Sequence, residues 1–581
     1  MDFLRELSNR LPGRERCQGL LKHVPIPALQ GACVLEIDLT RGLAEVPPTS
    51  PLEALRARNT PQLHEVIDGL RRAVTDDKVA ALIVHASSNV TLSQVQELRR
   101  GILRFRASGK PTLAWTESFG ELVHGTTGYL AATSCEQIWV QPSGDVTVHG
   151  IVAGGLFVRG ALDKIGVLPQ FARRQEYKSA AELFLAESMS EPNRAMLTRI
   201  VESVNDTMVA DMADTRADRG VTLAAARDLL ERGRLSAEEA LERGFIDAIG
   251  YRQQAFVWLR ERIADPDEKA PLTFVERYRK SALSPVPAVA GSHRPTVAVI
   301  GAHGAIHLGR SGGASPTGGH TVGSDSLTAT LRAARRDKDV RAVVLRIDSP
   351  GGSYIASDAI RAEVLALRES GTRVVASMGG VAASGGYFIA MPCERILANP
   401  ATLTGSIGVL AGKNVVREGM RRLGINRQDV SLGRFDEMFS TQRPFSDAEW
   451  ARLDTWLDEV YADFTGKAAT DRGMVLSELE SLARGRVWSG VDARLNGLVD
   501  DLGGLDDAIR VACELAQLDR AQVDVRRLPK LGPLDRFLPT ENSDSPVGAR
   551  LGEGLSLYDR ASLALGLNSA GVLTMPPLRL S

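Results

Sequence analysis

The chain has few cysteines and no long apolar run, and each shortage excludes a class of protein. Five cysteines are scattered through 581 residues without a C-x-x-C pair, so we expect neither a disulfide framework nor a zinc site. No stretch of about 18 or more uncharged apolar residues exists, so we expect no membrane-spanning helix. Charges at Asp2, Arg5 and Glu6 interrupt the N-terminal segment, which therefore lacks the apolar centre of a signal peptide.

An excess of either charge sign is also missing. The 70 Lys and Arg residues nearly balance the 71 Asp and Glu residues, so no nucleic-acid partner is expected. Hydrophobic residues make up 44% of the chain, which is enough for full globular cores. Phe3, Leu4, Leu7 and Leu11 could form one face of a short interfacial helix, but a helix packed on the body of the protein is the simpler expectation. Peripheral contact with the cell membrane and a cytoplasmic location therefore both stay open.

The most informative pattern is an internal repeat. Gly128-Tyr129 in the first half matches Gly386-Tyr387 in the second half, 258 positions later. A second segment repeats as well, because R-G-R-L-S from Arg232 parallels R-G-R-V-W-S from Arg484. The chain is therefore predicted to be α/β, with two tandem copies of one module. Alternation of strand and helix patterns predicts mainly parallel sheets with helical crossovers.

Composition suggests where the modules begin and end. A stretch rich in proline, serine and charge separates the two copies, as is typical of linkers. The expected divisions are an N-terminal segment without a spanning helix (1–30), a first module (31–263), a linker (264–295), a second module (296–529) and a C-terminal tail (530–581).

One stretch, residues 343–409, combines apolar runs with glycine-rich turns. The apolar run Val343–Ile347 leads into a turn at 349–352 with the sequence S-P-G-G, and a helix-period segment and a second apolar run follow. Strand, glycine turn, helix and strand form a βαβ unit. The unit ends in the small-residue cluster 379–387, in which Ser384 carries a hydroxyl. Backbone N–H groups from two such turns could form an oxyanion hole, with Ser384 as the nucleophile beside it.

The S-P-G-G turn and the A-A-S-G-G-Y cluster together resemble the signal peptide peptidase A (protease IV) family, in its long two-module form. Gly352 and Ser384, one in each motif, are 32 positions apart. More distantly, the motifs resemble the Clp protease catalytic subunit and the crotonases, which implies a Clp protease/crotonase-like fold. The resemblance implies that Ser384 is the nucleophile, that the N–H groups of Gly352 and Gly385 form the oxyanion hole, and that Ser406 supports the base. It implies no metal and no organic cofactor.

The general base is expected to come from the other module. Arginine does not lose its proton, no histidine lies within residues 343–409, and only 11 of the 70 basic residues are lysine. Lys178 lies in Y-K-S-A, which resembles the segment that supplies the base in this family. The first copy has Thr126 in place of Ser384 and lacks the S-P-G-G turn, whereas the second copy lacks the lysine. This complementary loss predicts one composite site, in which burial lowers the pKa of Lys178.

Two other features have simpler interpretations. Asp348 precedes the S-P-G-G turn, and an Asx-type turn is a simpler role for it than acid catalysis. The Gly- and Ser-rich segment 301–323 carries three histidines but no cysteine or acidic partner at ligand spacing. A mobile loop is therefore expected there in preference to a metal site.

The resemblance implies a serine endopeptidase with a Ser-Lys dyad that acts on cleaved signal peptides or other short unfolded peptides. It implies self-association, and a homotetramer is the expected assembly for a chain with two modules. Two alternatives stay open: an acyl-CoA-handling enzyme of the crotonase type, and a non-catalytic scaffold of the same fold. The Ser-Lys pairing argues against both.

Overall fold

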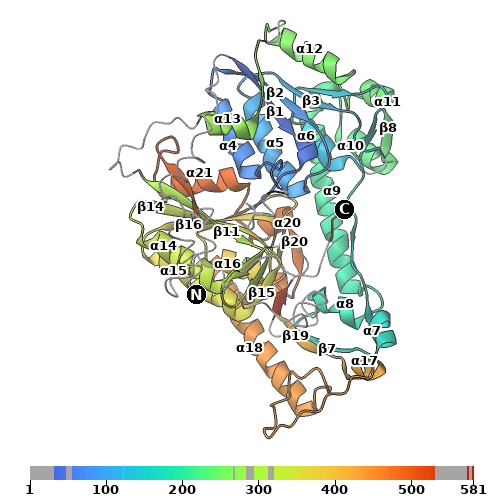
Figure 1. Cartoon of the computed structure of the whole chain (residues 1–581), viewed down its shortest axis with the longest axis vertical. Helices are drawn as coiled ribbons and strands as arrows, with labels where there is room; N and C mark the ends of the chain where they lie inside the picture. Colours follow the sequence, from blue (N-terminus) through green and yellow to red (C-terminus); the bar gives the residue numbers. More distant parts are fainter. Residues whose placement is uncertain are drawn as a thin grey trace, which may run out of the picture.

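The computed structural model describes residues 32–46, 57–121, 124–265, 269–282, 294–311 and 320–529, together with Leu55, Val572–Thr574 and Arg579–Leu580. Figure 1 shows two α/β bodies along the long axis and an arm of helices that runs beside them. The predicted N-terminal segment, 1–30, lies outside the described residues. Within the part described, no helix has both the length and the apolar character needed to cross a bilayer.

The first module is built on a parallel sheet. Its strands lie in the order β10 (Leu272–Phe274), β1 (Cys33–Asp38), β2 (Val79–His85), β3 (Thr112–Thr116), β4 (Gln137–Val140) and β9 (Ala248–Ile249), and every neighbouring pair is parallel. One face packs on α4 (Leu63–Ala73), α5 (Leu92–Arg106) and α6 (Thr126–Ala132), and the other face packs on α12 (Arg252–Arg262). The sheet is therefore buried on both faces, as parallel sheets usually are.

The second module repeats this arrangement. The strands β22 (Asp524–Leu528), β11 (Thr296–His303), β14 (Val340–Ser349), β16 (Arg373–Ala383), β17 (Arg395–Ala398) and β21 (Asp501–Leu502) pair in parallel in this order. In β14, Val343 and Leu345 pack toward α14 (Ser324–Arg336), α15 (Tyr354–Glu369) and α16 (Gly385–Ala390), whereas Ala342 and Val344 face α21 (Leu505–Leu515). Because successive side chains of a strand point to opposite faces, β14 contributes residues to the apolar cores on both sides of the sheet.

Equivalent contacts mark the duplication. Tyr129 donates its hydroxyl to the carbonyl of Phe245 at 2.8 Å, and Tyr387 donates to the carbonyl of Leu498 at 3.0 Å. Both tyrosines are fully buried and lie within a short helix. The prediction of an α/β chain with tandem modules, mainly parallel sheets and helical crossovers is confirmed.

The structure corrects one predicted boundary and one predicted loop. The segment 264–295, predicted as a linker, contains β10 and α13 (Val275–Ala282), and β10 pairs with β1 at the edge of the first sheet. Val275 and Tyr278 are buried in the first core, so the first module continues through this helix. In the segment 301–323, predicted as a mobile loop, the described residues include β12 (Ala305–His307) and β13 (Thr321–Gly323), which pair in parallel, whereas 312–319 lie outside the described residues.

Each module extends an arm, and the two arms pair with each other. The first arm contains α7 (Arg159–Ile165), β7 (Leu168–Arg173) and α8 (Glu182–Leu185) and returns through the 25-residue helix α9 (Glu191–Thr215). The second arm contains β19 (Leu410–Val415) and α17 (Arg417–Arg422) and returns through α18 (Asp447–Arg472). Figure 1 shows α7, β7 and α8 beside β19 and α17, far from the first sheet. The strand β7 of the first module pairs antiparallel with β19, so it joins a sheet of the second module.

A third sheet forms around this pairing. Its order is β13, β12, β15 (Gly351–Ser353), β23 (Val572–Thr574), β19 and β7. The strand β23 belongs to the predicted C-terminal tail, 530–581, and pairs antiparallel with both β15 and β19. Arg579–Leu580 (β24) pairs with β6 (Ala153–Gly154) of the first module. The described parts of the tail therefore pack on their own chain.

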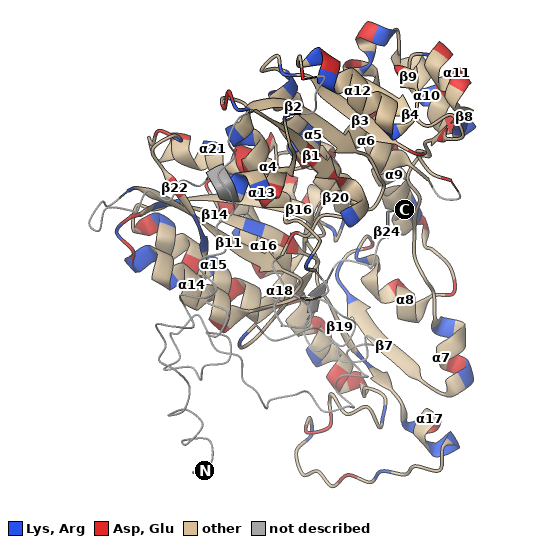
Figure 2. Ribbon diagram, turned by 45° about the horizontal axis from the view of Figure 1, so that its top comes forward, with Lys and Arg blue, Asp and Glu red and all other residues tan. Residues whose placement is uncertain are grey.

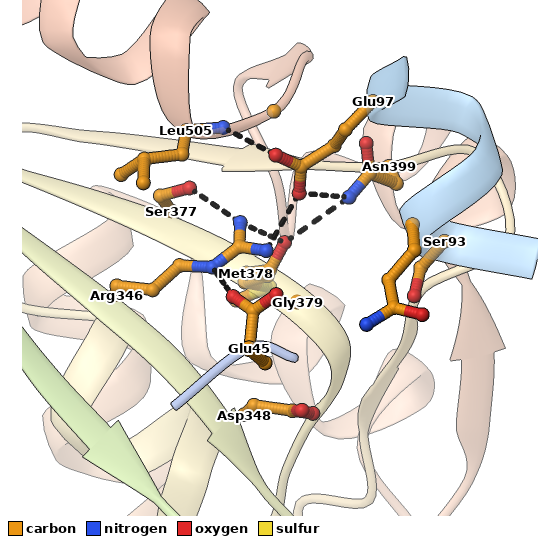
Figure 3. Close-up of polar contacts among 12 residues, drawn as sticks. Glu45, Ser93, Glu97, Arg346, Asp348, Ser377, Met378, Gly379, Asn399 and Leu505 are labelled. Carbon is orange, nitrogen blue, oxygen red and sulfur yellow. Dashed lines mark hydrogen bonds and ion pairs between the residues drawn. The ribbon is translucent and has the colours of Figure 1, made fainter. Parts of the chain in front are cut away.

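A buried charge cluster joins the modules (Figure 3). Arg346 on β14 donates to Glu45 and to Glu97 of the first module, at 2.6 Å in each case. Arg346 and Glu97 are both almost fully buried, and Asn399 also donates to Glu97 at 3.0 Å. Elsewhere, acidic and basic residues are interspersed along outer helices such as α7 and α14 (Figure 2). Buried pairs of this kind depend on good geometry and full hydrogen bonding, which this cluster has.

Candidate active site

Ser384 stands at the junction between β16 and α16. Its side chain is fully buried, and its N–H donates to the carbonyl of Gly405 at 2.8 Å. Its φ is +55°, a left-handed conformation that is uncommon for residues other than glycine. Such strained positions concentrate at functional sites, where the surrounding structure must hold them in place.

Lys178 reaches Ser384 from the first arm. It follows β7 and precedes a short 3-10 helix, Ser179–Ala181, and it is fully buried. Its Nζ lies 2.8 Å from Ser384 Oγ, 2.9 Å from the Ser406 carbonyl oxygen and 3.1 Å from Ser406 Oγ. A neutral amine has two N–H donors and one lone pair, and these three neighbours match that set. In the neutral form of the amine, the two N–H groups would donate to Ser406 and the lone pair would accept from the Ser384 hydroxyl.

Burial holds the pKa of Lys178 well below its usual value. Removing an ammonium ion from water disfavours the charged form, and desolvation is the cause of this shift. Tyr177 and Ala383, the chain neighbours of Lys178 and Ser384, belong to an apolar cluster that also includes Met196, Leu403 and Val487. The amine is therefore poised to be neutral and to accept a proton.

Gly352 and Gly385 bring backbone N–H groups beside the serine. Gly352 lies on β15 with φ of +156°, and a Cβ added there would clash with the carbonyl of Ile306. Gly385 is the first residue of α16, where N–H groups have no partner within the helix. A Cβ on Gly385 would lie 3.0 Å from the backbone nitrogen of Gly352, so the two residues are adjacent. The two residues therefore lie side by side next to Ser384, where backbone donors of an oxyanion hole would be needed.

Ser406 completes the arrangement. It has φ of +50°, is fully buried, and donates its N–H to the Arg486 carbonyl at 2.7 Å. The structure thus brings together all five residues singled out from the sequence: Lys178, Gly352, Ser384, Gly385 and Ser406.

Arg173, which the sequence did not indicate, contacts the backbone of Lys178 and is itself paired with Glu182. Arg173 donates to the Lys178 carbonyl at 3.2 Å and to Glu182 at 3.0 Å. Burial opposes ionisation of Glu182, but hydrogen bonds from Ser190 and Arg173 lower its pKa below the usual value. An Arg and a Glu nine residues apart look like an ordinary surface pair in the sequence, so only the fold reveals their role.

Asp348 and Thr126 do not join the site as catalytic groups. The Asx-type turn predicted for Asp348 is wrong, because Asp348 accepts from the N–H of Val381 at 3.0 Å, while Ser349 Oγ accepts from Gly351. Burial, with Glu45 nearby, raises the pKa of Asp348 to about 6. Thr126, at the position of Ser384 in the first module, donates its hydroxyl to the carbonyl of His149 at 3.0 Å.

Comparisons with known proteins agree with this geometry. The model of peptidase family S49 matches residues 104–264 and 366–519. Serine protease SPPA, chloroplastic, from Arabidopsis thaliana is 31% identical over 461 residues, which cover 79% of this chain and 66% of that protein. Protease 4 from Salmonella typhi is 32% identical over 469 residues, covering 80% of this chain and 73% of that protein. Protease 4 from Haemophilus influenzae is 29% identical over 465 residues, covering 78% and 72%. The chain therefore belongs to peptidase family S49 and is a serine peptidase.

Proposed function

We propose that this chain is an endopeptidase whose catalytic dyad consists of Ser384 and Lys178, one from each module. The observation that carries the proposal is the 2.8 Å separation between Lys178 Nζ and Ser384 Oγ in a fully buried setting. A serine hydroxyl becomes an effective nucleophile when a neighbouring base takes its proton. Burial lowers the pKa of Lys178 well below its usual value, which favours the neutral amine that can act as such a base.

The proposed reaction has two steps. Ser384 Oγ attacks the carbonyl carbon of the scissile peptide while Lys178 takes the hydroxyl proton, and the N–H groups of Gly352 and Gly385 hold the developing oxyanion. Lys178 then protonates the leaving nitrogen, the C–N bond breaks, and an acyl-enzyme remains. Water, deprotonated by Lys178, attacks the ester and restores Ser384. Ser406 accepts from the amine and keeps Nζ directed at Ser384. Loss of one oxyanion donor typically costs about 10²–10³ in rate.

The substrate is proposed to bind as an extended strand between β15 and β19. The tail strand β23 already occupies this place, with Gly352 opposite Leu573 and Leu410 opposite Val572, antiparallel in both pairings. Strand addition of this kind supplies affinity through backbone hydrogen bonds and therefore needs an unfolded peptide. An incoming peptide would lie along Gly352, one of the two proposed oxyanion donors.

The proposed substrates are cleaved signal peptides or other short unfolded peptides with small or apolar residues at the cut. Two features support this class. The motifs around Ser384 and Lys178 resemble those of the signal peptide peptidase A family, and the strand β15 beside the serine pairs with an extended segment, not with a folded domain.

Peptide cleavage by purified variants tests the proposal. A synthetic signal-peptide sequence should be cut by the wild type, and Ser384→Ala and Lys178→Ala should each lose about 10³-fold or more in rate. Two matched controls should keep activity. Thr126→Ala removes the counterpart hydroxyl in the first module, and Lys413→Met removes a second buried lysine, whose pKa burial lowers to about 8. Equal cleavage by all five proteins would refute the dyad. Absence of cleavage with tight acyl-CoA binding would favour the crotonase-type alternative, and absence of both would favour a scaffold.

We also propose that the chain assembles with itself as a homotetramer. Leu423, Val430 and Leu432 lie between α17 and α18 with 77%, 97% and 101% of their surface exposed, and a neighbouring copy would cover them. Sedimentation at micromolar concentration tests this, because a monomer would contradict it.

Peripheral membrane contact also stays a proposal, and flotation with anionic vesicles tests it against a cytoplasmic location.

A further inference from the structure

A three-residue loop, Arg484–Arg486, lies between the segment that carries Lys178 and the segment that carries Ser406. Each of its residues makes a backbone hydrogen bond to one of these two segments. The Arg484 carbonyl accepts from Tyr177 at 3.2 Å, the Gly485 N–H donates to Ile407 at 2.7 Å, and the Arg486 carbonyl accepts from Ser406 at 2.7 Å. The loop belongs to the second module and Tyr177 to the first, so these bonds join the two halves of the site.

The middle residue of this loop touches the backbone of Lys178. Gly485 has φ of +77°, and a Cβ added there would lie 2.6 Å from Lys178 N, 2.7 Å from its Cβ and 2.8 Å from its Cα. Gly408 closes the other side, because a Cβ there would lie 2.8 Å from Gly485 Cα and 3.3 Å from Lys178 Cδ. Contacts below 3.0 Å force something to move. Only a residue without a side chain fits between Lys178 and Gly408.

We propose that Gly485 is a positioning residue for the base Lys178. Its backbone is the surface against which the first arm docks, and this contact fixes how far Nζ reaches toward Ser384. It also covers the lysine stem, so it helps to exclude the water that would restore the ordinary pKa. This inference rests on the proposed function, because it assigns Gly485 a role only through Lys178.

The internal repeat shows that this role is specific to one copy. Arg232-Gly233-Arg234 is the counterpart of the loop in the first module, and Gly233 has nearly the same φ, +75°. A Cβ on Gly233 would meet the imidazole of His149 at 2.7 Å and no lysine. Both copies therefore keep the R-G-R turn, but only the second copy places its glycine against the base.

Three matched alanine variants test the inference. Gly485→Ala is compared with Gly233→Ala, which has the same motif and backbone conformation, and with Gly473→Ala. Gly473 lies in the second module at φ of +63° with open space around the added Cβ, so it carries the conformational strain alone. The measurements are the second-order rate of labelling by a fluorophosphonate probe across pH, and the thermal midpoint.

Gly485→Ala should label about 10- to 100-fold more slowly than the wild type at neutral pH, because a displaced base loses its alignment. The pH at which labelling reaches half its maximal rate should be higher in Gly485→Ala than in the wild type, because the pKa of a more hydrated Lys178 lies closer to its usual value. Gly233→Ala and Gly473→Ala should keep the wild-type pH profile even where their thermal midpoints fall. If Gly485→Ala lacks the wild-type circular dichroism spectrum, Gly408→Ala takes its place, because its Cβ presses on the same contact from an ordinary backbone conformation.

The outcomes separate this inference from the proposed function. The positioning role alone would be overturned if the wild type labels at Ser384 and Gly485→Ala matches the two controls in rate and pH profile. The same holds for Gly408→Ala where it replaces Gly485→Ala. A wild type that does not label at Ser384 would overturn the proposed dyad and the positioning role with it. A slower rate with an unchanged pH profile in Gly485→Ala would also contradict the inference, because it would indicate general loosening of the fold.

Discussion

Replacing Glu97 with glutamine tests whether the buried charge cluster holds the two modules together (Figure 3). Glu97 Oε1 accepts from Arg346 at 2.6 Å and from Asn399 at 3.0 Å, and Oε2 accepts from the N–H of Leu505 at 3.0 Å. Glutamine offers one acceptor oxygen, and its amide nitrogen only donates. In Glu97→Gln, at least one of these donors must therefore face another donor in a dry environment.

The expected cost is large. A buried donor without a partner costs about 1–3 kcal/mol, and removing one partner of a buried ion pair costs about 3–5 kcal/mol. Arg346 still keeps Glu45 at 2.6 Å, so we expect a total of about 3–5 kcal/mol. For modules of about 150–250 residues, each kcal/mol lowers the thermal midpoint by about 2–4 °C. The predicted decrease is therefore about 6–20 °C.

Differential scanning fluorimetry of Glu97→Gln beside Asp206→Asn measures this effect. Asp206 pairs with Arg227 at 2.8 Å on the first module, and both side chains are more than half exposed. Exposed pairs are worth about 0–1 kcal/mol, so Asp206→Asn should change the midpoint by no more than about 4 °C. A Glu97→Gln midpoint that matches this control would refute the reasoning, because it would mean that the cluster adds nothing to docking of the modules.

Three further predictions concern the site. Lys178→Met should raise the thermal midpoint at neutral pH, because folding of the wild type must release the lysine proton. This gain should shrink as pH rises toward the usual lysine pKa, about 10.4, and a gain independent of pH would contradict this cause. Deletion of residues 530–581 should increase peptide cleavage, since it frees the place between β15 and β19 that β23 fills; unchanged KM and kcat would argue against competition by the tail. Gly352→Ala should lower kcat by about 10²-fold or more, because its Cβ would clash with the carbonyl of Ile306 and move a proposed oxyanion donor; wild-type kcat would exclude that donor.

Much of the fold could be predicted from local patterns in the sequence. The apolar run at Val343–Ile347 lies within β14, and the helix-period segment after the S-P-G-G turn lies within α15. These elements are predictable because alternating and helical apolar patterns reflect burial directly. The repeat then predicted the second module from the first, and complementary loss of the serine and the lysine pointed to one site. The close approach of Lys178 to Ser384 is the geometry that this reasoning anticipated.

Other features depend on contacts between distant segments, which leave little trace in one sequence. Leu272–Phe274 is too short to indicate a strand, and it is ordered by pairing with β1. The tail strand Val572–Thr574 lies in a stretch rich in proline and glycine, and it becomes a strand only between β15 and β19. Arg346 and Glu97 are 249 positions apart, so their pairing follows from how the modules dock. Gly485 looks the same as Gly233 in sequence, and the fold alone places it against Lys178.

The central claim is that one site is built from Ser384 of the second module and Lys178 of the first. Fluorophosphonate labelling followed by peptide mapping tests it most directly, with the wild type beside Ser384→Ala, Lys178→Ala and Lys413→Met. The account predicts one modified peptide containing Ser384 in the wild type and in Lys413→Met, no labelling in Ser384→Ala, and a sharp fall in Lys178→Ala. Labelling of another serine, or an undiminished rate in Lys178→Ala, would contradict it.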